Sequence, residues 1–134
     1  MNTSVTMFRR GLEHLDNPYK NIVENLFNAL QEVFDEDLVS VIVFGSVGRG
    51  DARKDSDLDI LIIIEDLPRS RFERLKQYMK AEEKIDPLLY ELYEKGYAIS
   101  ISPILKTRRE AEKISPLYLD MTEDAVIIHD KENF

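Results

Sequence analysis

The spacing of hydrophobic positions in the first half of the chain predicts one helix and two buried strands. Across residues 18–34 the apolar side chains recur every three or four positions, which is the period of one face of an amphipathic helix. Asn17, followed by Pro18, is a suitable cap for the start of this helix. Residues 38–44 and 58–64 are short, continuous and rich in β-branched side chains, which is typical of strands buried in a sheet.

The second half of the chain continues this mixture of helices and strands. Helical patterns cover residues 70–84 and 86–95, and Pro87 separates them because a proline disfavours a helical residue before it. Gly96 is expected to end the second of these helices. Two further strands are predicted at residues 97–105 and 125–129, and two short helices at residues 108–113 and 116–123. This order predicts an α/β (α+β) fold, a mixed β-sheet flanked by helices.

The size and composition of the chain are those of a single globular domain. Its 134 residues are enough for one hydrophobic core, and 43% hydrophobic with 33% charged residues is a globular balance. We therefore expect one domain over residues 1–134, in which residues 1–17 form an N-terminal extension before the first helix.

The net charge and the lack of cysteine restrict the partners and the compartment. A formal net charge of −8 at pH 7 argues against nonspecific nucleic-acid binding, which depends on Lys and Arg that neutralise phosphates. The chain has no cysteine and therefore no disulfide framework, which fits a reducing compartment such as the cytoplasm. No apolar run reaches the length of a signal peptide or a membrane span, so we expect no contact with a membrane.

The loop between the two buried strands concentrates glycine and charge. Residues 45–59 read GSVGRGDARKDSDLD. Gly45 and the glycines that follow it let the backbone turn sharply and bring its amide groups close to an anion, and Arg49 adds positive charge in the same place. A phosphate group suits both features. The alternative is an ordinary glycine-rich turn that ends a strand.

Two aspartates stand at the start of the second buried strand. Asp57 and Asp59 are two positions apart, and alternate residues of a strand point to the same face, so Leu58 and Ile60 are expected to face the core. Two neighbouring carboxylates repel each other unless a cation lies between them. Mg²⁺ takes oxygen ligands and is commonly held by one or two carboxylates together with substrate phosphates. The pattern therefore predicts a magnesium site beside a phosphate-binding loop.

These residues resemble the signature of a known family. Gly45 and Ser46, ten intervening residues and then the run DLDI at 57–60 are similar to the signature of the DNA polymerase β-like nucleotidyltransferase superfamily. Residues 41–65 look most like the motif of the minimal nucleotidyltransferase (MNT) domains of bacteria and archaea.

The resemblance implies a fold, an activity and roles for individual residues. The fold would be the polymerase β palm-like sheet. The activity would be Mg²⁺-dependent transfer of a nucleoside monophosphate, AMP from ATP, to a hydroxyl of a protein or small molecule, with release of pyrophosphate. Gly45 and Ser46 would contact the phosphates of the nucleoside triphosphate, and Arg49 is a further candidate for phosphate binding on its charge. Asp57 and Asp59 would be the catalytic residues and the ligands of Mg²⁺, the expected cofactor.

One part of the family pattern is missing from this chain. Active relatives usually carry a third carboxylate on a later strand, whereas the strand at residues 97–105 has Ser100 at the expected position. The weaker candidates for a replacement are Asp86, Asp120 and Asp130. Either one of these residues supplies the third carboxylate that binds the metal, or catalysis is reduced or absent. The alternative function is therefore a nucleotide-binding or protein-binding module that regulates a partner without turnover.

The resemblance also implies a partner. Many MNT proteins are antitoxins paired with a HEPN-domain toxin, and some transfer AMP to a tyrosine of that toxin, so a HEPN-domain protein is the expected partner. Tyr90, Tyr93 and Tyr97 have a spacing that could mark a partner surface, but aromatic residues at helical spacing are more often packing residues. The sequence leaves self-association as a homo-oligomer open.

Overall fold

The strands of the protein form a single mixed sheet. The computed structural model describes residues 9–11, 13, 15–45, 47, 57–113 and 126–130. Within this part of the chain the strands lie in the order β1-β5-β2-β3-β4. The pairs β2–β3 and β2–β5 are antiparallel, whereas β3–β4 and β1–β5 are parallel, which confirms the predicted mixed sheet. The strand bounds are β1 Arg9–Arg10, β2 Leu38–Phe44, β3 Asp57–Ile64, β4 Ser100–Thr107 and β5 Val126–Asp130.

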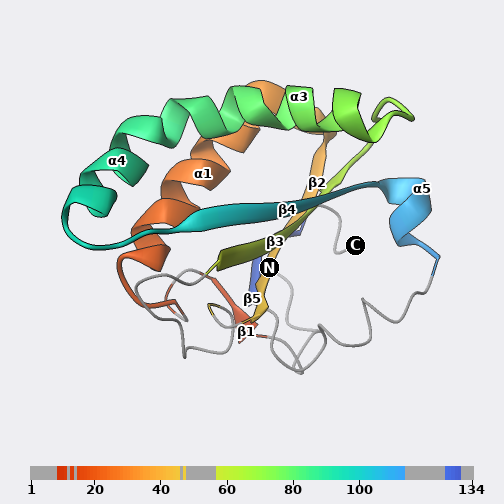
Figure 1. Ribbon diagram of the computed structural model, residues 1–134. Coiled ribbons are helices and arrows are strands. Elements are labelled where there is room, and N and C mark those ends of the chain that lie inside the picture. The colour runs from red at the N-terminus through yellow and green to blue at the C-terminus, as the bar shows by residue number, and fades with distance from the viewer. Residues whose placement is uncertain are drawn as a thin grey trace.

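The helices gather mainly on one side of this sheet. The described helices are α1 Tyr19–Phe34, α3 Arg71–Glu82, α4 Asp86–Glu94 and α5 Arg108–Ala111, with 3₁₀ turns at Asp35–Asp37 and Glu83–Ile85. Figure 1 shows α1, α3 and α4 on the same side of the sheet, with α5 at the far end of β4. None of the described helices is both long enough and apolar enough to cross a membrane.

The sheet has two different faces, and α1 covers one of them. Leu26 of α1 is fully buried and belongs to the same cluster as Leu58 and Ile60 of β3. On the opposite face of β3, Leu61 and Ile63 belong to a second and smaller cluster. Burying a side chain of this size is worth about 1.5–3 kcal/mol, so the alternation along β3 fixes which of its residues point toward α1.

The short connection between α1 and β2 decides which ends of the elements meet. The turn at Asp35–Asp37 reverses the chain, so α1 and β2 run in opposite directions. Phe44, the last residue of β2, lies opposite Asp59 near the start of β3. Leu15 before α1 and Val47 after β2 are buried in the same cluster. The start of α1, the end of β2 and the start of β3 therefore lie together at one end of the sheet.

Most predicted elements agree with the structure to within a few residues. The strand predicted at 38–44 is β2, and the one predicted at 58–64 is β3 with one further residue. The strand predicted at 97–105 begins three residues later, because the chain must first leave the turn that ends α4. Strand β1 was not predicted, since two residues show no periodicity. The short helix predicted at 116–123 lies outside the described residues.

Gly96 ends α4, as predicted. It has φ +99°, the left-handed conformation that glycine adopts without cost. Its N–H donates to the carbonyl of Tyr93 at 3.0 Å, and the N–H of Tyr97 donates to the carbonyl of Leu92 at 2.9 Å. These two bonds form a Schellman motif, which satisfies carbonyl groups that a helix end would otherwise leave unpaired.

An ion pair joins α3 to the segment that follows β4. Both terminal nitrogens of Arg74 donate to the carboxylate oxygens of Glu110, at 2.8 and 2.9 Å, and Arg74 also donates to the carbonyls of Pro68 and Leu105. Glu110 in turn accepts the N–H of Thr107 at 3.0 Å, while the Thr107 hydroxyl accepts the N–H of Glu110 at 3.1 Å. This reciprocal pair is a capping box, which starts α5 and at the same time aims Glu110 at Arg74.

Removing the charge of Glu110 is expected to destabilise the protein at neutral pH but not in acid. The hydrogen bonds from Arg74 lower the pKa of Glu110 to about 2 from its ordinary value of 4.5. Because the folded state favours the ionised form, this stabilisation is complete above pH 4.5 and is lost as the pH falls toward 2. Glu110 is partly exposed, so we expect Glu110→Gln to lower the melting temperature at neutral pH by only about 2–5 °C.

Thermal unfolding followed by circular dichroism between neutral and acidic pH checks this expectation. The melting temperatures of the wild type and Glu110→Gln should converge below pH 4.5. Glu112→Gln is the matched control, because Glu112 is an exposed carboxylate two positions after Glu110 and takes no part in this ion pair. A difference between the wild type and Glu110→Gln that stayed constant over the whole pH range would contradict the assignment.

Candidate functional site

The glycine that follows β2 has a conformation that other residues resist. Gly45 has φ +73°, in the left-handed region. A Cβ atom at this position would collide with Oδ2 of Asp59 and would lie 3.2 Å from its Cγ. The main chain at Gly45 therefore lies directly against the Asp59 carboxylate, and both the backbone conformation and the space favour glycine.

Asp57 and Asp59 project from the same face of β3, as predicted. Asp57 is exposed and Asp59 is half-buried, whereas Leu58 between them is fully buried in the cluster that contains α1. The two carboxylates therefore lie on the face of β3 that α1 does not cover. They stand where the chain enters β3, at the end of the sheet where β2 finishes.

The segment after β2 is anchored to the core near its start. Val47 is 3% exposed and packs in the cluster that contains α1, two positions after Gly45. Ser46 and Arg49, which were predicted to contact phosphates, lie outside the described residues, so their roles stay predictions.

The strand next to β3 carries serine beside each of the two aspartates. In the parallel pair β3–β4, Ser100 lies opposite Asp57 and Ser102 lies opposite Asp59. Among the described residues no group of three His, Cys, Asp or Glu side chains is arranged to hold a metal ion. The position expected for a third carboxylate is therefore occupied by serine, as the sequence indicated.

Two of the three candidates for a replacement can be judged. The expectation for Asp130 is wrong. In β5 it lies opposite Ser40 of β2. Ser40 is four positions before Phe44, so Asp130 lies about 13 Å along the strand from the candidate site. Asp86 is the first residue of α4 and belongs to no such metal-binding group among the described residues. Asp120 lies outside the described residues.

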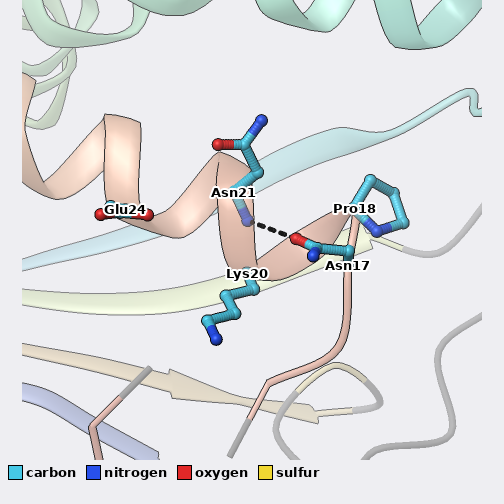
Figure 2. A pocket seen from close by; sticks show the side chains of 5 residues that line it. All are labelled: Asn17, Pro18, Lys20, Asn21 and Glu24. Atoms are coloured by element: carbon cyan, nitrogen blue, oxygen red, sulfur yellow. Dashed lines mark hydrogen bonds between the residues drawn. The ribbon is translucent and has the colours of Figure 1, made fainter. Parts of the chain in front are cut away.

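A polar hollow lies at the start of α1, at the end of the sheet where β2 finishes and β3 begins. Its volume is about 350 Å³. Oδ1 of Asn17 accepts a hydrogen bond from the backbone N–H of Asn21 at 3.2 Å (Figure 2). The N-cap of α1 is nevertheless Pro18, one residue later than the predicted cap Asn17. The hollow was not predicted, because polar residues on the first turns of a helix look like any solvated helix face. Its lining residues, all labelled in Figure 2, are Asn17, Pro18, Lys20, Asn21 and Glu24.

The structure thus brings together three of the five predicted site residues. Gly45, Asp57 and Asp59 meet at one end of the sheet, although Gly45 and Asp59 are fourteen positions apart in the sequence. Chemically, the arrangement offers a backbone that an anion can approach and two carboxylate groups that can supply oxygen ligands to a hard cation.

Comparison with known proteins identifies relatives by sequence. Residues 23–129 match the nucleotidyltransferase domain family. A candidate protein adenylyltransferase of Methanocaldococcus jannaschii, MJ1305, is 36% identical over 116 residues, which are 85% of this chain and 74% of that protein. The protein adenylyltransferase MntA of Thermococcus cleftensis is 48% identical over a shorter stretch of 40 residues, which are 29% of this chain and 40% of MntA.

A search of solved structures identifies a similar fold. The crystal structure of a toxin–antitoxin with AMP-PNP matches with a TM-score of 0.51 over 81% of this chain and 74% of that one. The sequence identity in this match is 16%, so the likeness concerns the fold alone. It agrees with the mixed α/β fold described above, and with the fold that the sequence motif implied.

Proposed function

This chain belongs to the nucleotidyltransferase domain family and is a transferase of that class, and from this premise we propose that it transfers AMP from ATP to a hydroxyl group of a protein. The observation that carries the proposal is the contact between Gly45 and the Asp59 carboxylate. Because of this contact, a turn that an anion can approach lies beside a carboxylate that can bind a cation. A magnesium–triphosphate complex carries both charges, and it is the ligand that suits this pairing.

The donor set at this place fits Mg²⁺. Asp57 and Asp59 lie on one face of β3, and a side chain at position 45 would fill the space beside Asp59. Carboxylate oxygens are the ligands that Mg²⁺ prefers, and one or two of them are usual when the substrate supplies phosphate oxygens as well. Asp57 and Asp59 would hold the ion, which when bound supplies charge neutralisation at the reacting phosphates.

The contribution of the protein to the reaction is mainly positioning. Gly45 bends the chain so that the loop amides, with Ser46 and Arg49, can donate to the β- and γ-phosphates as negative charge develops on the leaving pyrophosphate. The acceptor oxygen forms a bond to the α-phosphorus, the bond between the α- and β-phosphates breaks, and the hydroxyl proton passes to water. Such a transfer needs orientation and charge stabilisation more than it needs a covalent intermediate.

The names of the relatives support a protein as the acceptor. MJ1305 and MntA are both described as protein adenylyltransferases, and the structure of similar fold contains a toxin and an antitoxin together with AMP-PNP, an analogue of ATP. On this support we extend the proposal to the role of an MNT antitoxin that modifies a HEPN-domain toxin. Fold likeness alone would not carry this step, because one fold serves many functions.

Labelling with radioactive ATP tests the proposal directly. The purified chain is incubated with Mg²⁺ and α-labelled ATP, alone and with the product of the neighbouring gene, and both labelled protein and released pyrophosphate are measured. We expect label on the partner, formation of pyrophosphate in equal amount, and loss of both when EDTA removes the metal. The proposal would be overturned if neither labelled product nor pyrophosphate formed with any protein or small-molecule hydroxyl acceptor.

A second candidate function follows from the serine residues of β4. Because Ser100 and Ser102 lie beside Asp57 and Asp59 where a third carboxylate would complete the site, the chain could bind the nucleotide and regulate a partner with little turnover. Tight binding of Mg·ATP without labelled product would favour this function over the first.

Adding the missing carboxylate is expected to raise the rate of transfer. In the variant Ser100→Asp a third acidic group stands beside Asp57 on the same face of the sheet, where it can bind metal or accept the proton of the acceptor hydroxyl. We expect the rate of AMP transfer to increase at least about tenfold, given that general bases contribute about 10²–10⁴. Ser100→Asn is the matched control of equal size, and Ser102→Asp tests the neighbouring position. Unchanged rates in both aspartate variants would mean that the protein does not need a carboxylate on β4.

A further inference from the structure

A groove with positive charge lies between α3 and the second half of β4, where its lining begins at Pro103, the residue after Ser102. We call it the α3/β4 groove; its volume is about 570 Å³, and β4 is the edge strand of the described sheet. Its lining combines cationic side chains, Arg69, Arg71 and Lys106, with apolar ones such as Leu75 and Pro103. A concentration of cations is unexpected on a chain with a net charge of −8.

The positive charge of the groove is only partly neutralised within the protein. Arg74, which also lines the groove, is held by both oxygens of Glu110. Arg69 and Arg71 are exposed, and the side chain of neither forms an ion pair or hydrogen bond with another residue in the part of the chain that the structure describes. The groove therefore remains attractive to carboxylate groups.

Apolar side chains extend the groove along α3. Phe72, Leu75 and Met79 are 68%, 44% and 36% exposed, and their spacing of three and four positions puts them in one stripe on the helix. Single exposed apolar residues are common on protein surfaces, but a continuous stripe beside a groove is typical of a binding surface. A partner for this surface must carry both apolar side chains and carboxylates.

The chain itself presents such a surface on α4. Tyr90 and Tyr93 are 63% and 66% exposed, so the expectation that these tyrosines are packing residues is wrong for both. Asp86 and Glu94 are also exposed, and their spacing from Tyr90 by four positions in each direction places them on the same side of the helix. We call these four residues the α4 tyrosine face. Of the three tyrosines, Tyr97 alone packs against the core cluster.

We propose that the α4 tyrosine face of one copy of the chain docks in the α3/β4 groove of a second copy, a property beyond the transferase function. The two surfaces have opposite charge, and both carry large apolar groups that a single copy leaves exposed to water. Carboxylates beside aromatic rings would meet arginines beside aliphatic side chains, which is a common composition for protein interfaces. A nucleic acid is the less suitable occupant of the groove, because its phosphates would pair with the arginines but would leave the apolar stripe of α3 exposed to water.

The arrangement of the helices allows this contact to form twice. α3 and α4 follow each other on the same side of the sheet, joined by the short turn at Glu83–Ile85 (Figure 1). In a two-fold dimer with these helices antiparallel, α4 of each copy lies beside α3 of the other, so one contact implies its equivalent. We therefore expect a closed dimer.

Charge reversal tests the proposed dimer. The groove variant is Arg69→Glu with Arg71→Glu, and the face variant is Asp86→Lys with Glu94→Lys. Sedimentation velocity at about 100 μM protein should show the wild type as a dimer and each variant alone as a monomer, with the dissociation constant raised at least about 100-fold. An equal mixture of the two variants should again form dimers, because each altered surface then meets an altered partner of opposite charge and the unaltered pair remains.

Matched controls separate the proposed contact from a general effect of charge. Lys80→Glu and Glu91→Lys make the same kinds of change on α3 and α4, at exposed positions outside the two surfaces, and should leave the dimer intact. Tyr90→Ala with Tyr93→Ala should produce a monomer without any change of charge. A monomeric wild type, a dimer that persists in both charge variants, or a mixture that stays monomeric would overturn the proposal. Circular dichroism and the melting temperature confirm that each variant is folded.

Discussion

Replacing Asp57 and Asp59 together by asparagine is expected to abolish AMP transfer while the fold stays as stable as the wild type. Asparagine keeps the shape of the side chain but removes the negative charge with which the pair would bind Mg²⁺. We expect the rate of transfer to fall at least about 1,000-fold, because charge stabilisation at the reacting phosphates is the largest contribution to such a reaction. The two like charges at alternate positions repel each other, so the melting temperature should be unchanged or slightly higher.

Three measurements check this result on the same protein samples. These are labelled AMP transfer, calorimetric binding of Mg·ATP, and thermal unfolding. Asp66→Asn with Glu83→Gln removes two exposed negative charges elsewhere and should leave all three unchanged. A melting temperature lowered by many degrees would assign Asp57 and Asp59 a structural role, and full transfer activity would exclude them from the site.

Introducing a single methyl group at Gly45 is expected to damage both stability and activity. The backbone there has φ +73°, which costs an alanine about 1–2 kcal/mol, and the new Cβ would collide with the Asp59 carboxylate. Since either the carboxylate or the loop must move, we expect Gly45→Ala to destabilise the fold by about 2–4 kcal/mol. A displacement of about 1 Å at a reacting centre costs about 10²-fold in rate, and AMP transfer should fall by this amount.

Gly96→Ala is a control that separates backbone strain from the collision. Gly96 also has a positive φ, +99°, but a Cβ there would have no neighbour within 4 Å. This variant should show the backbone cost alone and keep full activity. The collision also predicts that Gly45→Ala costs less stability when Asp59 is already replaced by alanine, and a double-mutant cycle measures the difference. Equal destabilisation by Gly45→Ala in both backgrounds would show that Asp59 does not restrict the space at position 45.

The comparison of Gly45 with Tyr90 shows which parts of the candidate site and its surroundings could be predicted. Gly45 stands directly after a buried strand, and the need for a sharp turn there is a local property that the sequence displays. Tyr90 and Tyr93 have a helical spacing, but spacing does not say toward which side of a helix the core lies. Leu92 faces the core of the protein, and the two tyrosines are consequently turned outward.

The position of the third acidic group illustrates the same limit. The sequence shows serine in the later strand, but the register that puts Ser100 opposite Asp57 and Ser102 opposite Asp59 depends on pairing between β3 and β4. For the same reason Asp130 looked like a candidate, and the pairing of β5 with β2 places it opposite Ser40 instead. Strand pairing of this kind joins residues more than forty positions apart, for which no local period exists.

Local patterns in the chain were sufficient for the described α-helices, the two strands β2 and β3 and the common face of Asp57 and Asp59, because these features depend on side-chain direction within a single element. Packing was needed for the order β1-β5-β2-β3-β4, the contact between Gly45 and Asp59, and the basic groove beside α3. Each of these features depends on which distant elements pack their apolar faces together. This packing minimises the exposed apolar surface of the whole molecule, and no short segment of the sequence encodes it.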